Sequence, residues 1–275
     1  MKIDAHQHFW KYNPQRDAWI TTDMQVSRQD FLPANLQGLL RENSIDGCVA
    51  VQADSSIDET RFLLQLASEH DFIRGVVGWV DLLSGDLDKR LEEWSSHSGL
   101  LKGFRHIVQA EPAGFLDNPA FVRNVKMLTR FNYTYDLLIY PHQLAEATRF
   151  VRQTGDQPIV LDHLAKPSIR HKEITEWRKQ IKELSANPHV YCKLSGLVTE
   201  ADWSNWKEAD CRPYLEVALD CFGPRRLMFG SDWPVCLLAA SYHQVTSIVK
   251  NFIASLSAEE KKAIMGENAI HFYNL

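Results

Sequence analysis

Residues 132–165 read NYTYDLLIYPHQLAEATRFVRQTGDQPIVLDHLA and contain a complete strand–helix–strand unit. Two short runs rich in β-branched and aromatic side chains, 132–140 and 158–165, are typical of strands. Between them, 142–153 repeats apolar side chains at spacings of three and four residues, the period of a helix. Pro141 occupies a first helical position, where the missing N–H costs nothing. Because the helix provides a crossover connection, we expect the two strands to pair in parallel.

The same alternation runs along the whole chain. The other strand-like runs are 2–9, 45–53, 73–82, 101–109, 190–197 and 227–235. The other helical patterns cover 34–43, 58–70, 86–96, 118–130, 173–186, 206–221 and 242–255. Eight strand–helix units within about 230 residues have the length and count of a (β/α)8 barrel. A doubly wound open sheet is the alternative, but it usually has fewer strands, and no GxGxxG motif follows any run. No linker-like tract divides 1–275, which predicts one domain.

The composition excludes several classes of protein. The chain has 275 residues, of which 45% are hydrophobic and 24% charged, and its net charge is −5. No basic run offers a surface for nucleic acid or for an anionic membrane. The apolar runs are far shorter than the roughly 20 residues that span a bilayer, and residues 1–30 lack a secretory pattern. Five cysteines without a CxxC pair indicate reduced thiols, so we expect a cytoplasmic protein.

Polar side chains stand near the end of every predicted strand. In a (β/α)8 barrel these ends meet on one face, where such barrels perform their chemistry. Strands that only fill a core would end in Val, Ile or Leu. In chain order the residues are His6, His8, Gln52, Asp54, Trp79, Asp81, Arg105, His106, Asp136, Asp162, His163, Lys193, Ser195, Ser231, Asp232 and Trp233. So many titratable or hydrogen-bonding groups at one face predict an active site.

Two histidines on the first strand are the strongest candidates. Side chains alternate along a strand, so His6 and His8 point to one side while Gln7 points to the other. Both imidazoles can therefore reach one ion or one oxyanion. We expect His163 and Asp232, from the sixth and eighth strands, to complete a cluster with them. The structural alternatives are hydrogen-bonded core histidines and, for Asp232, a turn-capping aspartate before proline.

Two cationic side chains have roles that the sequence leaves open. Arg105 could clamp a carbonyl or carboxylate of a substrate, or it could form a structural ion pair with Asp81 or Asp136. His106 follows Arg105 directly, and because side chains alternate, only one of the two can face the pocket. Lys193 could act as a base or hold an anion, or it could point to the surface.

Five motifs resemble the amidohydrolase superfamily. They are DAHQHFW at 4–10, GFRH at 103–106, LDHLAKP at 161–167, FGSDWP at 229–234 and the closing ENAIHFYNL at 267–275. The chain is most similar to the amidohydrolase-related branch, which contains sugar lactonases of the L-fuconolactonase and L-rhamnono-lactonase type and the 2-pyrone-4,6-dicarboxylate lactonase. HxH alone is a weak signal. HxHFW, DHLxKP and GSDWP in this order are together specific, and the resemblance runs from residue 2 to 275.

The resemblance implies hydrolysis of a sugar lactone in carbohydrate catabolism. An aldonolactone such as L-fuconolactone is the expected substrate. Asp232 is the expected general base that takes a proton from water. His6, His8 and His163 are expected to polarise the carbonyl and stabilise the oxyanion. The residues expected to orient the substrate are Arg105, Trp10, Asp81, Asp136, His142 and Trp233, although tryptophans also serve as large core residues.

The resemblance also bears on metals. In the wider superfamily a divalent ion is held by the first-strand HxH, by later histidines and by the eighth-strand aspartate. Here the fifth strand offers no histidine, and Arg105 stands where a bridging lysine or glutamate often lies, so the usual zinc shell is incomplete. We therefore expect catalysis that requires no metal. If an ion such as zinc is bound, its expected ligands are His6, His8 and Asp232.

Two other functions remain open on sequence grounds. One is a metal-dependent amidohydrolase or decarboxylase of the same superfamily, acting on another small carboxylate or amide. The other is a barrel that binds sugar acids without chemistry. The chain has no GxSxG motif and no paired Cys–His signature, which argues against an acyl-enzyme route. The expected partner is a small lactone, with neither nucleic acid nor membrane, and the sequence predicts no oligomeric state.

Overall fold

The computed structural model describes the backbone of every residue and all side chains except that of His97. The described chain forms eight parallel strands that follow one another around a single sheet in sequence order. They are β1 (Ile3–Gln7), β2 (Gly47–Val51), β3 (Ile73–Gly78), β4 (Leu101–His106), β5 (Thr134–Leu137), β6 (Ile159–Leu161), β7 (Val190–Leu194) and β8 (Leu227–Phe229). The sheet closes through backbone hydrogen bonds from His8 N to Trp233 O (2.7 Å) and from Asp232 N to His6 O (2.8 Å). The predicted (β/α)8 barrel is confirmed.

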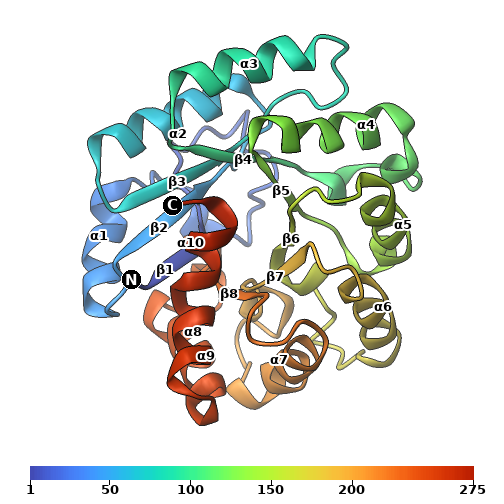
Figure 1. Cartoon of the computed structure of the whole chain (residues 1–275). Helices are drawn as coiled ribbons and strands as arrows, with labels where there is room; N and C mark the ends of the chain where they lie inside the picture. The colour runs from blue at the N-terminus through green and yellow to red at the C-terminus, as the bar shows by residue number, and fades with distance from the viewer.

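Helices surround the barrel and cover the outer face of the sheet, as Figure 1 shows. They are α1 (Pro33–Glu42), α2 (Ile57–Glu69), α3 (Leu87–His97), α4 (Pro119–Met127), α5 (Leu144–Thr154), α6 (Thr175–Ser185), α7 (Glu208–Phe222) and α8 (Tyr242–Phe252). Each predicted helix is present with ends shifted by a few residues. The strands are shorter than expected, and several polar residues predicted at their ends, such as His8, His163 and Asp232, lie just after the strands. The predicted strand 158–165 retains only Ile159–Leu161.

Side-chain caps start several of these helices. The hydroxyl of Ser56 accepts a hydrogen bond from the N–H of Glu59 at the first turn of α2. Asn118 accepts one from the N–H of Ala120 at the start of α4, directly before Pro119. These caps satisfy N–H groups that have no partner within the helix.

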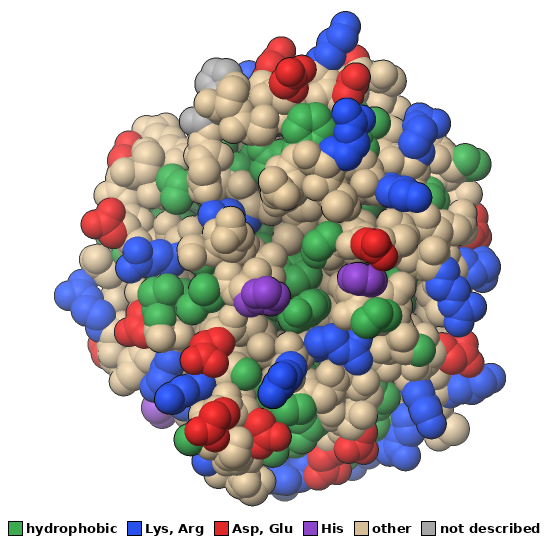
Figure 2. Space-filling view, in the orientation of Figure 1, with side chains coloured by type: hydrophobic (Ala, Val, Ile, Leu, Met, Phe, Trp, Pro, Cys, Tyr) green, Lys and Arg blue, Asp and Glu red, His purple; other side chains and the backbone are tan. Residues whose placement is uncertain are grey.

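The C-terminal segment closes the amino end of the barrel. It comprises α9 (Ala258–Lys262), a π-helical turn η10 (Ala263–Glu267) and α10 (Asn268–Tyr273). Phe272 packs with strand residues that include Val49, Val77, Val160 and Met228. Figure 1 shows α10 over this end, and Figure 2 shows the same face with apolar side chains near its middle and charged ones around its rim. The sequence patterns predict no element beyond residue 255, so this cover is a finding of the structure.

None of the helices in the described chain is both long enough and apolar enough to cross a membrane.

Candidate active site

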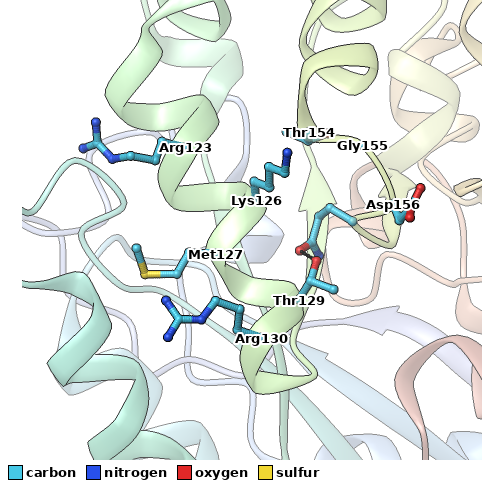
Figure 3. Close-up of a pocket in the computed structure, with 9 residues that line it drawn as sticks. Arg123, Lys126, Met127, Thr129, Arg130, Thr154, Gly155 and Asp156 are labelled. Atoms are coloured by element: carbon cyan, nitrogen blue, oxygen red, sulfur yellow. Dashed lines mark hydrogen bonds between the residues drawn. The ribbon is translucent and has the colours of Figure 1, made fainter.

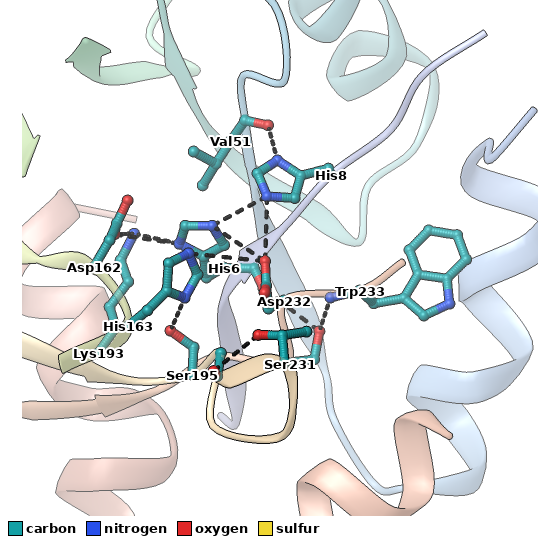
Figure 4. Close-up of polar contacts among 12 residues, drawn as sticks. His6, His8, Val51, Asp162, His163, Lys193, Ser195, Ser231, Asp232 and Trp233 are labelled. Atoms are coloured by element: carbon teal, nitrogen blue, oxygen red, sulfur yellow. Dashed lines mark hydrogen bonds and ion pairs between the residues drawn. The ribbon is translucent and has the colours of Figure 1, made fainter. Parts of the chain in front are cut away.

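Four side chains converge at the carboxyl end of the barrel (Figure 4). His6 and His8 lie at the end of β1, His163 follows β6, and Asp232 follows β8. The Oδ1 atom of Asp232 lies 3.5 Å from His8 Nε2 and 3.8 Å from the Nε2 atoms of both His6 and His163. All four residues are buried. The structure therefore brings together the four residues that the sequence singled out.

An unusual turn after β6 carries His163 into this cluster. His163, Leu164, Ala165 and Lys166 have φ values of 52°, 53°, 57° and 51°, which places successive residues in the left-handed region. Each L-residue in this region costs roughly 1–2 kcal/mol, so the surrounding packing must hold the turn in place. Trp177 contributes to this, because its Nε1 donates a hydrogen bond of 2.9 Å to the carbonyl of Leu164. Strain of this kind is typical of functional sites.

Two glycines allow the neighbouring strands to approach the histidines. Gly196, after β7, has a φ of +63°, and a Cβ atom on it would lie 2.7 Å from ring atoms of His163. Gly230, after β8, would place a Cβ atom 2.7 Å from the Cβ atom of His6. A larger residue at either position would push a cluster histidine away. Asp232 itself has a φ of 57° and is held by the bond from its N–H to the carbonyl of His6.

Asp4 supports the turn that carries Asp232. Its carboxylate accepts hydrogen bonds from the N–H of Ser231 at 2.8 Å and from the hydroxyl of Tyr242 at 3.0 Å. Burial raises the pKa of Asp4 to about 6, although these hydrogen bonds oppose the rise. The motif DAHQHFW begins with this aspartate, for which the sequence alone predicted no role.

Burial and mutual proximity set the charges of the cluster. Burial lowers the pKa of His163 to about 4 and holds the pKa of His6 well below its usual value. Burial alone would raise the pKa of Asp232, but the nearby His163 and a hydrogen bond with His8 outweigh it and bring the pKa below its usual value. At neutral pH, an ionised carboxylate therefore faces the neutral rings of His6 and His163.

A layer of charged side chains lies beneath the histidines, inside the barrel. The ammonium of Lys193 is fully buried and hydrogen-bonds to Asp136. It also lies 3.0 Å from Asp162 Oδ1 and 3.1 Å from His6 Nδ1. Arg105 donates to Asp162 Oδ2 at 3.1 Å. Two cations and two carboxylates thus compensate one another in a place that water does not reach.

Three residues for which the sequence suggested substrate or surface roles lie in this buried layer. Asp136, expected to orient substrate hydroxyls, is 0% exposed, and its oxygens accept from Lys193 and from the Tyr273 hydroxyl. Arg105 is 4% exposed and forms a structural ion pair, but its partner is Asp162 and not the predicted Asp81 or Asp136. Lys193 lies in the barrel interior, so the surface position considered for it is wrong. Arg105 is as exposed as Asp232, so a substrate contact stays a prediction for it, whereas Asp136 and Lys193 are fully buried.

His106 points to the other side of β4 from Arg105, as side-chain alternation predicts. Its Nε2 atom pairs with Glu111 at 2.8 Å, and its ring stacks on Phe115 with centroids 5.0 Å apart. Arg105 is therefore the member of this pair that faces the barrel interior.

Trp10 and Trp233 are core residues in this structure. Trp233 is 1% exposed, and its ring packs against Phe9 and Phe31 with centroids 6.2 and 5.2 Å away. In Figure 4 its ring points away from the histidines. Trp10 is 2% exposed and donates from Nε1 to the carbonyl of Gln29 at 2.9 Å. The role in orienting the substrate stays a prediction for both tryptophans, whose rings are almost completely buried in this structure.

His142 and Asp81 lie farther out. His142 is exposed and stacks on Tyr140 with ring centroids 6.0 Å apart. The ammonium of Lys166 lies 5.4 Å from the centre of the same Tyr140 ring, so His142 stands beside the left-handed turn. Asp81 is exposed and accepts a hydrogen bond from the N–H of Leu83 within its own turn. A substrate contact stays a prediction for His142, whereas the contact seen for Asp81 is structural.

Two charged residues beside the cluster received no role from the sequence. Lys166 and Glu200 place their charged groups 3.9 Å apart, and their side chains are 20% and 23% exposed. The charge of Lys166 acts on His163, and the charge of Asp232 acts on Glu200, so this pair borders the cluster. The motif LDHLAKP could have indicated a role for Lys166, because it holds this lysine in the same short segment as His163.

The positions of the donor atoms suit a small divalent cation. His6 Nε2, His8 Nε2 and Asp232 Oδ1 are separated by 3.2, 3.5 and 3.8 Å. In a tetrahedral zinc site with ligands at about 2.0–2.1 Å, neighbouring ligand atoms are roughly 3.3 Å apart. His8 Nδ1 lies 2.7 Å from the carbonyl of Val51, which is the outer contact that typically orients a metal-binding histidine. A divalent ion therefore fits at this place.

A separate cavity of about 520 Å³ lies on the outer surface, beside α4 and the segment that follows α5 (Figure 3). Its lining consists of Arg123, Lys126, Met127, Thr129, Arg130, Thr154, Gly155, Asp156 and Gln157. It shares no residue with the cluster, and its basic side chains are typical of a solvated helix face. The converging histidines and Asp232 therefore define the candidate site.

Known proteins resemble this chain over its full length. The profile of the amidohydrolase family matches residues 3–275. A curated protein of Burkholderia multivorans, L-fucono-1,5-lactonase, is 43% identical over 287 aligned positions that cover 100% of this chain and 96% of the relative. A second L-fucono-1,5-lactonase, from Burkholderia ambifaria, is 32% identical over 100% of this chain and 96% of its own length. A crystal structure of an amidohydrolase from Burkholderia multivorans with bound zinc is 43% identical and superposes with a TM-score of 0.97, covering 100% of this chain and 99% of that one.

Proposed function

The chain belongs to the amidohydrolase family, and we propose that it is a hydrolase that opens the ring of a sugar lactone. The observation that carries this proposal is the buried carboxylate of Asp232 with three histidine nitrogens within 3.8 Å. The full-length identity of 43% to an L-fucono-1,5-lactonase supports the choice of substrate class. L-fucono-1,5-lactone is therefore the first candidate substrate, and carbohydrate catabolism the first candidate pathway.

In this proposal Asp232 activates the attacking water. Its carboxylate is ionised at neutral pH, because its pKa lies below the usual value. It accepts a proton from a water molecule while the water oxygen attacks the carbonyl carbon of the lactone. The carbonyl oxygen then carries the negative charge of a tetrahedral species.

The histidines surround the place where this negative charge develops. His163 is neutral at pH 7, since its pKa is about 4, and its Nδ1 atom lies 2.9 Å from the hydroxyl of Ser195. Its Nε2 atom lies 3.8 Å from Asp232 Oδ1, and its ring centroid lies 4.4 Å from that of His6. Hydrogen-bond donors fixed in such a buried site stabilise the oxyanion more strongly than the carbonyl of the bound lactone.

Ring opening returns the proton. The bond between the carbonyl carbon and the ring oxygen breaks, and the proton held by Asp232 passes to the leaving alkoxide. Asp232 is again a carboxylate, and the product is a hydroxy acid. Because this acid ionises at neutral pH, each turnover releases one proton to the solvent.

A divalent ion held by His6, His8 and Asp232 would supply Lewis-acid polarisation of the carbonyl and would make a bound water more acidic. The zinc in the 43%-identical structure supports an ion at this place. The expectation that no metal is required has no support from that comparison, and it stays open to experiment.

A panel of aldonolactones followed with a pH indicator tests the proposed function. We expect L-fucono-1,5-lactone and related lactones to be opened, each releasing one proton. A matched panel of small amides and hydroxybenzoates should give no product. Lactone opening no faster than in buffer, or product from the second panel alone, would refute the proposal.

The same panel decides the role of a metal when it is repeated after dialysis against a chelator. An unchanged rate would mean that turnover needs no metal. A rate that is lost and then restored by zinc would mean that the ion is part of the site.

A further inference from the structure

Lys166 and Glu200 border the cluster but have no part in the proposed mechanism. The Nζ atom of Lys166 lies 3.9 Å from Glu200 Oε1, which is too long for a direct hydrogen bond. No other group that the structure describes donates to this carboxylate or accepts from this ammonium. The N–H donors of the ammonium and the oxygens of the carboxylate are therefore free to bind a further partner.

The burial of this pair distinguishes it from an ordinary surface ion pair. Its two side chains are 20% and 23% exposed, whereas those of Arg212 and Glu216 on α7 are 57% and 56% exposed. Burial raises the pKa of the Glu200 carboxyl, and the charge of Lys166 opposes the rise. Covering charged groups that are not hydrogen-bonded costs stability. Such a cost is typical of groups that a functional site requires.

The main chain fixes both residues beside His163. Lys166 is the last residue of the left-handed turn, and its N–H donates to the carbonyl of His163 at 2.7 Å. Glu200 lies in the loop after β7, and its carbonyl accepts from the N–H of Arg170 at 2.9 Å. The same loop begins with Ser195, whose hydroxyl lies 2.9 Å from His163 Nδ1. The loops after β6 and β7 are therefore joined to each other and to the cluster.

A third loop contributes Tyr140, which follows β5. The Lys166 ammonium lies 5.4 Å from the centre of its ring, a distance at which an aromatic ring attracts a cation. The N–H of Tyr140 donates to Gln143 Oε1 at 2.9 Å, and Pro141 follows, so the backbone that carries the ring is fixed. Burial and the charge of Glu200 both raise the pKa of the Tyr140 hydroxyl, so Glu200 also lies near this ring.

We infer that Lys166 and Glu200 bind hydroxyl groups of the sugar ring of the substrate. The ammonium donates to one hydroxyl oxygen, and the carboxylate accepts from an adjacent hydroxyl. The ring of an aldonolactone carries hydroxyls on neighbouring carbons, so these two contacts orient the ring while Asp232 activates the water that attacks its carbonyl. The inference rests on the proposed function for the identity of the substrate, and it adds a hydroxyl-binding subsite to that function.

The subsite has a consequence for specificity. A lactone without hydroxyls leaves both charged groups without a partner in a largely covered place. A site built to hydrogen-bond a substrate hydroxyl rejects an analogue that lacks it far more strongly than an apolar pocket rejects a change of size. Lys166 and Glu200 therefore select polyhydroxylated lactones over plain ones.

A comparison of two lactones tests this selection. δ-Hexalactone has the ring and the methyl group of L-fucono-1,5-lactone but no hydroxyls, and the ratio of kcat/KM for the hydroxylated lactone to that for δ-hexalactone measures the contribution of the hydroxyls. Lys166→Met and Glu200→Met should each lower this ratio about 10–100-fold, since each removes one charged hydrogen-bond partner. Glu216→Met, in the exposed ion pair on α7, is the matched control and should keep the wild-type ratio. A wild-type ratio in both subsite variants would overturn the inference, even if their rates on the two lactones fell equally.

A binding measurement separates failure of this inference from failure of the proposed function. 1,5-Anhydro-L-fucitol has the ring hydroxyls of the lactone and no carbonyl to be opened. We expect it to bind the wild type and Glu216→Met with the same Kd, measured by ligand-observed NMR, and to bind each subsite variant about 10-fold more weakly or worse. No binding to the wild type, or one Kd for all four proteins, would overturn the inference whether or not lactones are opened. The expected difference in Kd without any lactone opening would refute the proposed function and leave the subsite in place.

Discussion

The two ends of the barrel are built in opposite ways. The carboxyl end holds buried histidines and carboxylates, and residues 163–166 and Asp232 adopt left-handed backbone conformations there. The amino end is apolar, with Val160 and Met228 packed against Phe272. Strained backbone and buried polar groups cost stability, whereas buried apolar surface provides it. Activity and stability therefore depend on different ends, and substitutions at the two ends should separate them.

Asp232→Asn should have the largest effect on activity. The amide has nearly the same shape but cannot take a proton from water, so we expect turnover to fall about 10²–10⁴-fold. The melting temperature should fall by a few degrees at most, because the low pKa of Asp232 means that its ionised form stabilises the folded protein. Initial rates on L-fucono-1,5-lactone and thermal unfolding measure the two effects. Turnover close to that of the wild type would rule out Asp232 as the base.

Gly196→Ala should lower both activity and stability, because Gly196 packs against His163 at the strained carboxyl end of the barrel. The positive φ disfavours alanine by about 1–3 kcal/mol, and the new methyl group would displace the His163 ring. A shift of the ring by about 1 Å can cost on the order of 10²-fold in rate. We expect a lower melting temperature together with a lower kcat. A stable variant with unchanged kcat would show that the position of His163 does not matter.

Phe272→Ala should affect stability alone. The ring is 8% exposed and contacts Tyr191 and Tyr273 with centroids 4.9 and 4.8 Å away. Its removal should cost about 3 kcal/mol of unfolding free energy, measured by denaturant titration. The kcat of the folded fraction should be unchanged. A fall in kcat as large as that of Gly196→Ala would mean that the two ends do not act separately.

Glu59 should give the smallest effect, and it depends on pH. This buried carboxyl accepts from the N–H of Ala53 at 3.0 Å, and burial raises its pKa from 4.5 to about 7. The folded protein therefore keeps a proton that the unfolded chain releases, so this contribution to stability is lost as pH rises from about 4.5 to 7. Relative to the wild type, Glu59→Gln should gain a few degrees in melting temperature between about pH 5 and 7.5. A constant difference across that range would contradict this pKa.

The sequence predicts the barrel because each strand–helix unit carries its own local pattern. The eight strands and the helices between them follow from apolar periodicity, and the cluster follows from the position of polar residues after apolar runs. The C-terminal cover was not predictable in this way. Its residues, such as Phe272, become interior only because the barrel has an open end to be covered.

The partners of the buried charges were also beyond the sequence. Lys193, Asp136 and Asp162 meet because β5, β6 and β7 are neighbours in the sheet, and their meeting depends on the register between strands far apart in the chain. The left-handed turn at residues 163–166 contains no glycine, so no local signal marked it. The burial of Trp233 likewise depends on rings from other segments.

Single-turnover hydrolysis of L-fucono-1,5-lactone in H₂¹⁸O, with enzyme in excess over substrate, tests most directly whether Asp232 delivers water to the carbonyl carbon. Mass spectrometry of the product and of the peptide that contains Asp232 locates the label. We predict ¹⁸O in the carboxylate of the product and none in the protein. Label in the Asp232 carboxylate, which would mean that this side chain attacks the lactone itself, would contradict the proposed role, as would label in the hydroxyl released from the ring.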